Sequence, residues 1–127
     1  MRRSDQRRAA VVALYQQDVT GRPADELLPR DATLFTKELV EGVEVEREEL
    51  DALIERHAEG WTLDRIAPLE RNILRVALHE LRSREDIPNE VAIDEAVEAA
   101  KELCAREAPA FVNGILGAVQ RQRAAST

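Results

Sequence analysis

The fold of this chain is decided by residues 69–81, which read LERNILRVALHEL. Apolar residues recur there at the three- and four-residue spacing of a single helix face. We therefore expect this stretch to form the central core helix. His79 lies at the edge of the face, and we expect it to be a packed or partly exposed structural histidine. The apolar set is Leu69, Ile73, Leu74, Ala77, Leu78 and Leu81.

Helix start and stop signals lie on both sides of this central helix. Ser4 and Asp31 suit N-caps, and Gly21 suits the residue just past a helix end. Gly42 falls inside a predicted helix, where glycine costs about 1 kcal/mol relative to alanine unless close packing uses the missing side chain. The pattern predicts an all-α protein of six to seven helices, over about residues 4–20, 23–28, 31–46, 48–57 and 69–81, with further helices from Pro88 and from Pro109 and a short turn between Thr62 and Pro68.

The composition is that of one helical domain. Hydrophobic residues make up 44% of the chain, which is enough for a core, while aromatic residues make up only 3%. We expect residues 1–127 to form a single domain. Cys104 is the only cysteine, which excludes an internal disulfide, and the longest apolar run (9–15) is too short to span a bilayer. These features favour a cytoplasmic protein that does not bind a membrane.

Charge is distributed unevenly along the chain. The net charge is −7, yet residues 1–8 sum to +3 because Arg2, Arg3, Arg7 and Arg8 outnumber Asp5. A basic amino-terminal arm on an acidic body gives one end of a protein affinity for polyanions such as nucleic acid. The alternative is that these arginines form only the solvated start of a helix.

The sequence contains no pattern typical of catalysis or metal binding. His57, His79 and Cys104 are the only imidazole and thiol side chains, and their spacing matches no metal site. The glycines form neither a dinucleotide loop nor a phosphate loop. We therefore expect no catalytic residue, no metal and no cofactor, and predict that the protein is not an enzyme.

One glycine inside the last predicted helix is unexplained by helix propensity. Gly114 follows Asn113 in a stretch that is otherwise apolar. A glycine there indicates either the close approach of another backbone or ligand, or a helix kink or helix–helix contact. The sequence leaves these alternatives open.

Eight segments of the chain, in order, resemble the NusB family of bacterial transcription antitermination factors. Each segment is a weak signal alone, but their order and spacing together are specific. They are ALYQ (13–16), LVEGV (39–43), LDALI (50–54), Trp61, LERNILRVA (69–77), Glu80-Leu81, residues 87–97 and FVNGIL (111–116).

The resemblance implies both a fold and a function. The fold would be two small helical bundles packed together, without enzymatic activity. Members of the family pair with NusE, a small-subunit ribosomal protein, and together they bind the boxA element of nascent RNA. The resulting complex modifies RNA polymerase so that it reads through terminators, notably in ribosomal RNA operons. We expect the same partners here.

The resemblance also implies which residues bind. The arginine-rich start of the first helix contacts RNA in the family. This role falls most directly on Arg7, with Arg3 and Arg8 beside it and Tyr15 nearby on the same helix. For Tyr15 core packing is an equally good interpretation. The FVNG aromatic falls on Phe111 and the acid before it on Glu107, both expected near the RNA, although burial is the better interpretation of Phe111. The partner-facing acid of the central helix falls on Glu70.

Two other functions remain open at this point. A NusB-like domain also precedes the catalytic domain of some ribosomal RNA cytosine methyltransferases, so the chain could be an RNA-binding module of that kind. Alternatively, it could be a helical protein whose only role is protein contact, including a homodimer, because some NusB-like proteins dimerise.

Overall fold

Every regular element in the computed structural model is helical, across the residues that it describes, 2–125. This confirms the all-α prediction. No helix within this part of the chain is long and apolar enough to cross a membrane. The elements are α1 (Arg3–Thr20), α2 (Ala24–Leu27), α3 (Leu34–His57), the 3-10 turn η1 (Leu63–Arg65), α4 (Pro68–Ser83), α5 (Asn89–Leu103) and α6 (Ala108–Ala125).

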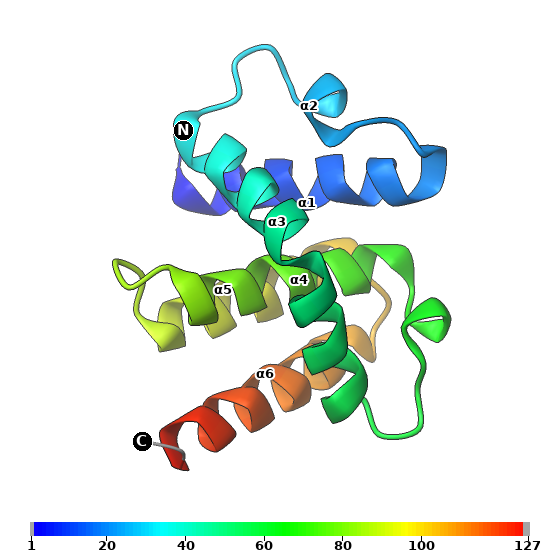
Figure 1. Ribbon diagram of the computed structural model, residues 1–127, viewed down its shortest axis with the longest axis vertical. Coiled ribbons are helices and arrows are strands. Elements are labelled where there is room, and N and C mark those ends of the chain that lie inside the picture. Colours follow the sequence, from blue (N-terminus) through cyan, green and yellow to red (C-terminus); the bar gives the residue numbers. More distant parts are fainter. Residues whose placement is uncertain (1, 126–127) are drawn as a thin grey trace.

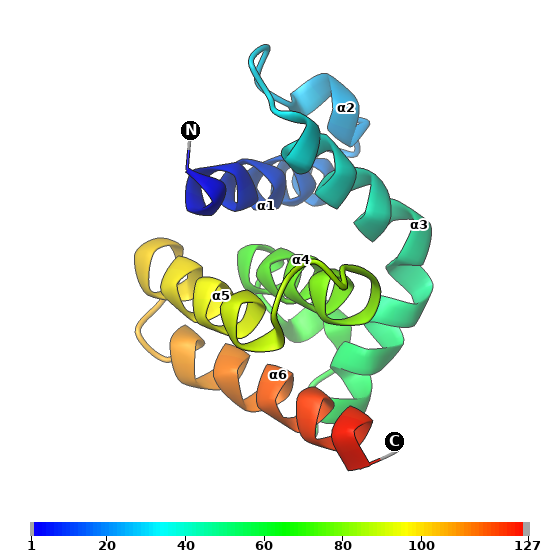
Figure 2. The same ribbon diagram turned by 90° about the vertical axis from the view of Figure 1, so that its left-hand side faces the viewer.

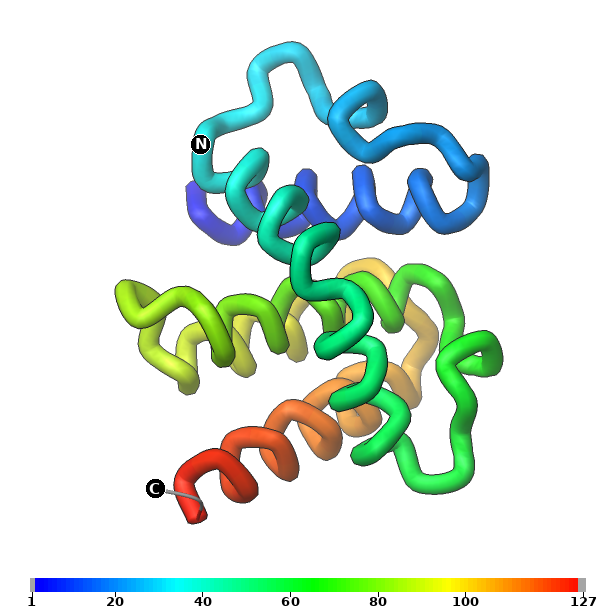
Figure 3. The backbone as a smooth tube through the Cα atoms, in the orientation of Figure 1, coloured from blue at the N-terminus to red at the C-terminus, as the bar shows by residue number. Residues whose placement is uncertain are grey.

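The prediction of two helices over residues 31–46 and 48–57 was wrong. One continuous helix, α3, covers both, and Figure 3 traces it past three layers of the structure. No proline or glycine interrupts the chain between the two predicted parts, and Arg47, at the predicted break, pairs with Asp18 of α1 at 3.2 Å. The N-cap of α3 is Thr33 rather than Asp31, because the Thr33 hydroxyl accepts a hydrogen bond from the Thr36 backbone N–H.

The ends of α1 and α6 also differ in part from the prediction. Gly21 does end α1, in the left-handed conformation (φ 76°), and its N–H donates to the Gln17 carbonyl. Ser4 is not the N-cap, because it lies inside the first turn and its hydroxyl donates to Glu95 of α5 at 2.8 Å. Helix α6 begins at Ala108, one residue before the predicted start at Pro109, and it continues to Ala125.

Helix α4 occupies the centre of the structure. It packs against α1, α3, α5 and α6. Figures 1 and 2 show α1 and α2 on one side of the layer formed by α4 and α5, α6 on the other side, and α3 running across all of these layers. Helix α4 is therefore the core element that the sequence predicted.

The burial of α4 extends beyond its apolar face. All residues from Asn72 to Leu81 are buried, and four of them, Asn72, Arg75, His79 and Glu80, are polar. A buried polar or charged group is tolerated only when it is hydrogen-bonded or paired. Each of these four side chains therefore needs a partner on a surrounding helix.

Asp18 of α1 is the partner of two of these buried side chains, Asn72 and Arg75. Its carboxylate accepts hydrogen bonds from Asn72 at 2.9 Å and from Arg75 at 2.7 Å. Arg75 also donates twice to Asp51 of α3, at 2.7 and 3.1 Å. Burial alone would raise the pKa of Asp18, but the hydrogen bonds and positive charges of its partners outweigh burial, so its pKa lies below the ordinary value of 3.8. This network ties α1, α3 and α4 together.

Gly42 of α3 lies directly against the ring of His79 of α4. His79 is buried, as predicted, and its Nδ1 lies 3.1 Å from Glu46 of α3. A Cβ atom on Gly42 would lie 2.2 Å from the His79 ring, far inside contact distance. Helices α3 and α4 thus approach closely at this point, and glycine is the residue that permits the approach.

Asp18→Asn is expected to lower the free energy of unfolding by about 3 kcal/mol, because it leaves Arg75 buried beside a neutral amide. Urea denaturation at pH 7 measures this, with the exposed Asp25→Asn as the matched control. The depressed pKa of Asp18 means that its stabilisation is complete above the ordinary carboxyl value and is lost as the pH falls below it. The difference between wild type and variant should therefore shrink below pH 3.8. Equal stability of the two proteins at pH 7 would contradict the network.

Candidate nucleic-acid and partner interface

Arg7 is a buried arginine. Only 8% of the residue is exposed, and its Nε donates to Oε1 of Glu80 at 2.8 Å. Burial raises the pKa of the Glu80 carboxyl above its ordinary value, and the hydrogen bond and charge of Arg7 offset part of this effect. The structure therefore places Arg7 as an anchor between α1 and α4, with little surface left for a ligand.

Arg3 lies one turn earlier on α1 and has a different environment. It is exposed, and its guanidinium lies over the ring of Phe35 of α3, 3.8 Å from the centroid. Among residues 2–125, no acidic side chain forms an ion pair with Arg3. A cation on an aromatic face keeps its hydrogen-bond donors at the ring edge, available to an anion.

The remaining arginines of the arm pair with acids near the surface. Arg8 forms an ion pair with the exposed Glu102 of α5 at 2.8 Å, and Arg2 pairs with Asp5 at 3.4 Å. Arg2 is exposed and Arg8 is mostly buried, but the carboxylates of both pairs are about half exposed, at 47% and 59%. A phosphate can therefore replace either carboxylate. Tyr15 lies on α1 about 18 Å along the axis from Arg3 and is half-buried, which fits both interpretations made from the sequence.

The other predicted residues lie together in a second place. Glu70, Glu107 and Phe111 line one pocket of about 390 Å³, together with Trp61, which is 51% exposed. Burial raises the pKa of Glu70 above its ordinary value, and the charge of Glu107 raises it further. Phe111 is half-buried, so it both packs on the core and lines the pocket.

Two carboxylates beside the exposed ring of Trp61 form a receptor for a cationic group, and Arg65 is the one basic residue that lines the same pocket. A lysine or arginine from another molecule would neutralise Glu70 and Glu107, and its aliphatic stem would cover Trp61. Burial and the charge of Glu70 raise the pKa of the nearby Cys104 thiol to about 11. At neutral pH this thiol is therefore mostly protonated, whereas a nucleophile would need the thiolate. Within residues 2–125, no group of acids, histidines and cysteine could hold a metal ion.

The predicted site residues thus fall into two groups, which we call the arm and the acidic pocket. The arm consists of Arg2, Arg3, Arg7 and Arg8, and the acidic pocket of Trp61, Glu70, Glu107 and Phe111. Sequence reasoning did not predict the contacts of the arm with Phe35 of α3 and Glu80 of α4. Nothing in the local sequence around these two residues indicates which helix they contact. Trp61 could have been found, since a tryptophan between Gly60 and Thr62 lies outside any apolar helix face.

An all-helical core that presents a basic arm and an acidic pocket has surfaces suited to binding other macromolecules. Residues 4–121 match the model of the NusB family. The transcription antitermination protein NusB of Rubrobacter xylanophilus is 44% identical over 91% of this chain and 88% of its own length, and that of Geobacillus kaustophilus is 41% identical over 94% and 96%. This chain belongs to the NusB family.

Solved structures agree with this assignment. NusB of T. maritima superimposes with a TM-score of 0.85 at 34% identity, over 95% of this chain and 92% of that one. A NusB chain from a crystal structure of antitermination factors NusB and NusE in complex with dsRNA superimposes with a TM-score of 0.80 at 30% identity, over 94% and 96%.

Two glycines give a paired test of the geometry. A Cβ atom on Gly114 would meet nothing within 4 Å, so no helix–helix contact uses the missing side chain. Gly114→Ala should therefore raise the free energy of unfolding by about 0.5–1 kcal/mol. Gly42→Ala should lower it, because the new methyl group strikes His79. Thermal unfolding of both variants measures this, and changes of the same sign would contradict the packing described.

Proposed function

We propose that this protein binds the boxA element of nascent ribosomal RNA together with the ribosomal protein NusE. Within an antitermination complex on RNA polymerase, it lets the polymerase read through terminators. The protein acts in the cytoplasm by binding, without catalysis, and residues 1–127 act as one RNA-binding helical domain. Family membership supports this role, as does the likeness to a NusB chain from a NusB–NusE complex with dsRNA.

The observation that carries the proposal is the exposed Arg3, which forms no ion pair among residues 2–125, at the head of a basic arm on a protein of net charge −7. An acidic body repels RNA, so basic surfaces such as the arm set where RNA can approach. Arg3 and Arg8 contact phosphates, and Arg7 fixes the helix that carries them. Tyr15 extends the same helix, where its exposed part is available for stacking on an unpaired base.

The acidic pocket is the docking site for the partner. Glu70 and Glu107 attract basic side chains of NusE, and the exposed ring of Trp61 supplies the apolar contact. The negative charge of this pocket disfavours RNA, so Glu107 and Phe111 lie at the border between the RNA and the partner. A partner that brings basic residues also compensates the acidic body and strengthens RNA binding by the pair.

Fluorescence anisotropy of a labelled boxA RNA against a scrambled RNA, with and without purified NusE, tests the proposal. We expect preferential binding of boxA that strengthens when NusE is added. Equal and weak binding of both RNAs, with no complex formed with NusE, would contradict it.

Arg3→Gln is expected to weaken boxA binding about tenfold at low salt and to reduce the salt dependence by about 0.7 in the logarithmic slope, the value for one phosphate contact on a single strand. The control is Arg56→Gln, which removes the same charge from an exposed position at the far end of α3. Equal effects of the two substitutions would show that only net charge matters.

Glu70→Gln is expected to weaken NusE binding while leaving RNA binding by the isolated protein unchanged, because the pocket contacts the protein partner. The wild-type complex should also weaken as the pH falls through the raised pKa of Glu70, above the ordinary glutamate value of 4.5, since protonation removes the charge that the partner neutralises. Isothermal titration calorimetry of NusE at several pH values checks both effects. If Glu70→Gln left the affinity for NusE unchanged, the docking site for NusE would have to lie outside the acidic pocket.

A further inference from the structure

Three arginines surround the single ring of Phe35. Besides Arg3 at 3.8 Å and Arg7 at 5.2 Å, the guanidinium of Arg84 lies 5.4 Å from the ring centroid. Arg84 is the residue directly after α4, in the turn that leads to α5. Residues that are 81 positions apart in the sequence thus place positive charge around one aromatic side chain.

Three acids near this cluster balance its three arginines in number, but two of these acids are exposed to solvent. Glu80 is occupied by Arg7, and Arg84 pairs with Glu38 at 3.2 Å and with Asp86 at 3.0 Å. The side chains of Glu38 and Asp86 are about half exposed, at 47% and 55%. Ion pairs with exposed carboxylates are weak and exchange readily for a stronger bidentate anion such as a phosphate.

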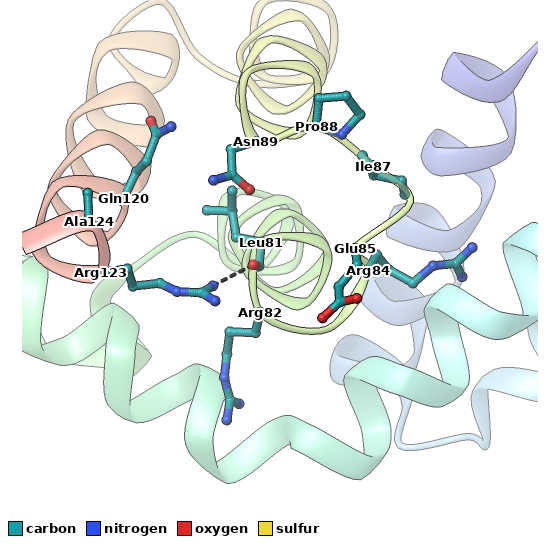
Figure 4. Close-up of a pocket in the computed structure, with 10 residues that line it drawn as sticks. All are labelled: Leu81, Arg82, Arg84, Glu85, Ile87, Pro88, Asn89, Gln120, Arg123 and Ala124. Atoms are coloured by element: carbon teal, nitrogen blue, oxygen red, sulfur yellow. Dashed lines mark hydrogen bonds between the residues drawn. The ribbon is translucent and has the colours of Figure 1, made fainter. Parts of the chain in front are cut away.

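The basic surface continues beyond Arg84 into a pocket of about 570 Å³ between the ends of α4 and α6 and the start of α5. Arg82 and Arg123 line this pocket as well, against a single acid, Glu85. In Figure 4, Arg123 reaches from α6 to the backbone carbonyl of Leu81, while Arg82 and Arg84 extend from the end of α4 in different directions. Arg84 both lines this pocket and lies beside Phe35, so it links the pocket to the arm in one path. Arg82 also pairs with Glu46 of α3 at 3.6 Å.

We propose that Arg84 and the pocket lined by Arg82 and Arg123 form a second phosphate-binding site, which binds the RNA backbone where it leaves the arm. This inference rests on the proposed RNA-binding function and adds to it a site that the arm alone does not contain. The path is separate from the acidic pocket, because Glu70 and Arg84 lie about 21 Å apart along the axis of α4.

The ligand that suits this path is a single-stranded phosphodiester chain. Phe35 is buried beneath the arginines and offers no face for a base to stack on. The donors around it are charged and planar, which suits bidentate contact with phosphate and carries no base preference. RNA passing from Arg3 to Arg84 would therefore gain affinity without gaining sequence specificity.

Two substitutions with opposite expected effects test this site. Anisotropy measures binding of a boxA RNA with single-stranded extensions at both ends. Arg84→Gln should weaken binding about tenfold and lower the salt slope by about 0.7. Asp86→Asn should tighten binding about threefold, because it frees Arg84 and removes a negative charge beside the phosphate. The control Arg56→Gln should change neither quantity.

A purely structural role for Arg84 predicts a different result. If the pair of Arg84 and Asp86 only clamps the turn, both substitutions weaken binding together and lower the melting temperature together, and the inference is overturned. It is also overturned if RNA binding responds to Arg3→Gln but to neither of the two substitutions, a result that leaves the proposed function intact. If the wild-type protein did not bind the RNA at all, both this inference and the proposed function would be overturned.

Discussion

Residues 72–81 of helix α4 are all buried, so each polar side chain among them needs a partner on another helix. Asn72 and Arg75 meet Asp18 of α1, Arg75 also meets Asp51 of α3, and Glu80 meets Arg7. Apolar packing holds the helices together but tolerates small shifts along their axes. Buried pairs do not, because a shifted partner leaves an uncompensated charge. These contacts therefore set how α1 and α3 lie against α4.

The same constraint prepares the arm for binding. The pair of Arg7 and Glu80 fixes the first turns of α1, and Arg3 and Arg8 lie one turn before and one residue after that anchor. An arm anchored in this way loses less conformational entropy on binding than a free peptide would. The arginines consequently divide into an inner one that organises the helix and outer ones that meet the ligand. A sequence pattern of four arginines does not reveal this division.

The sequence predicted the helices well where local chemistry decides them. The stripe of α4, the glycine that ends α1 and the buried His79 all follow from spacing and propensity. The prediction of two helices in place of α3 was wrong because Arg47 and its acidic neighbours resemble a solvated break, whereas Arg47 pairs with Asp18. The position of Arg84 beside Phe35 could not be predicted, because it depends on contacts between residues far apart in the chain.

The most direct measurement is an NMR titration of boxA RNA into protein labelled with ¹⁵N at its arginine side chains, observing the Nε–H signals. The account predicts that the signals of Arg3 and Arg84 shift as RNA is added, while that of Arg7 stays in place because its proton remains bonded to Glu80. A large shift of the Arg7 signal with no change at Arg3 and Arg84 would contradict the account, since it would make the buried arginine the one that leaves its partner to bind RNA.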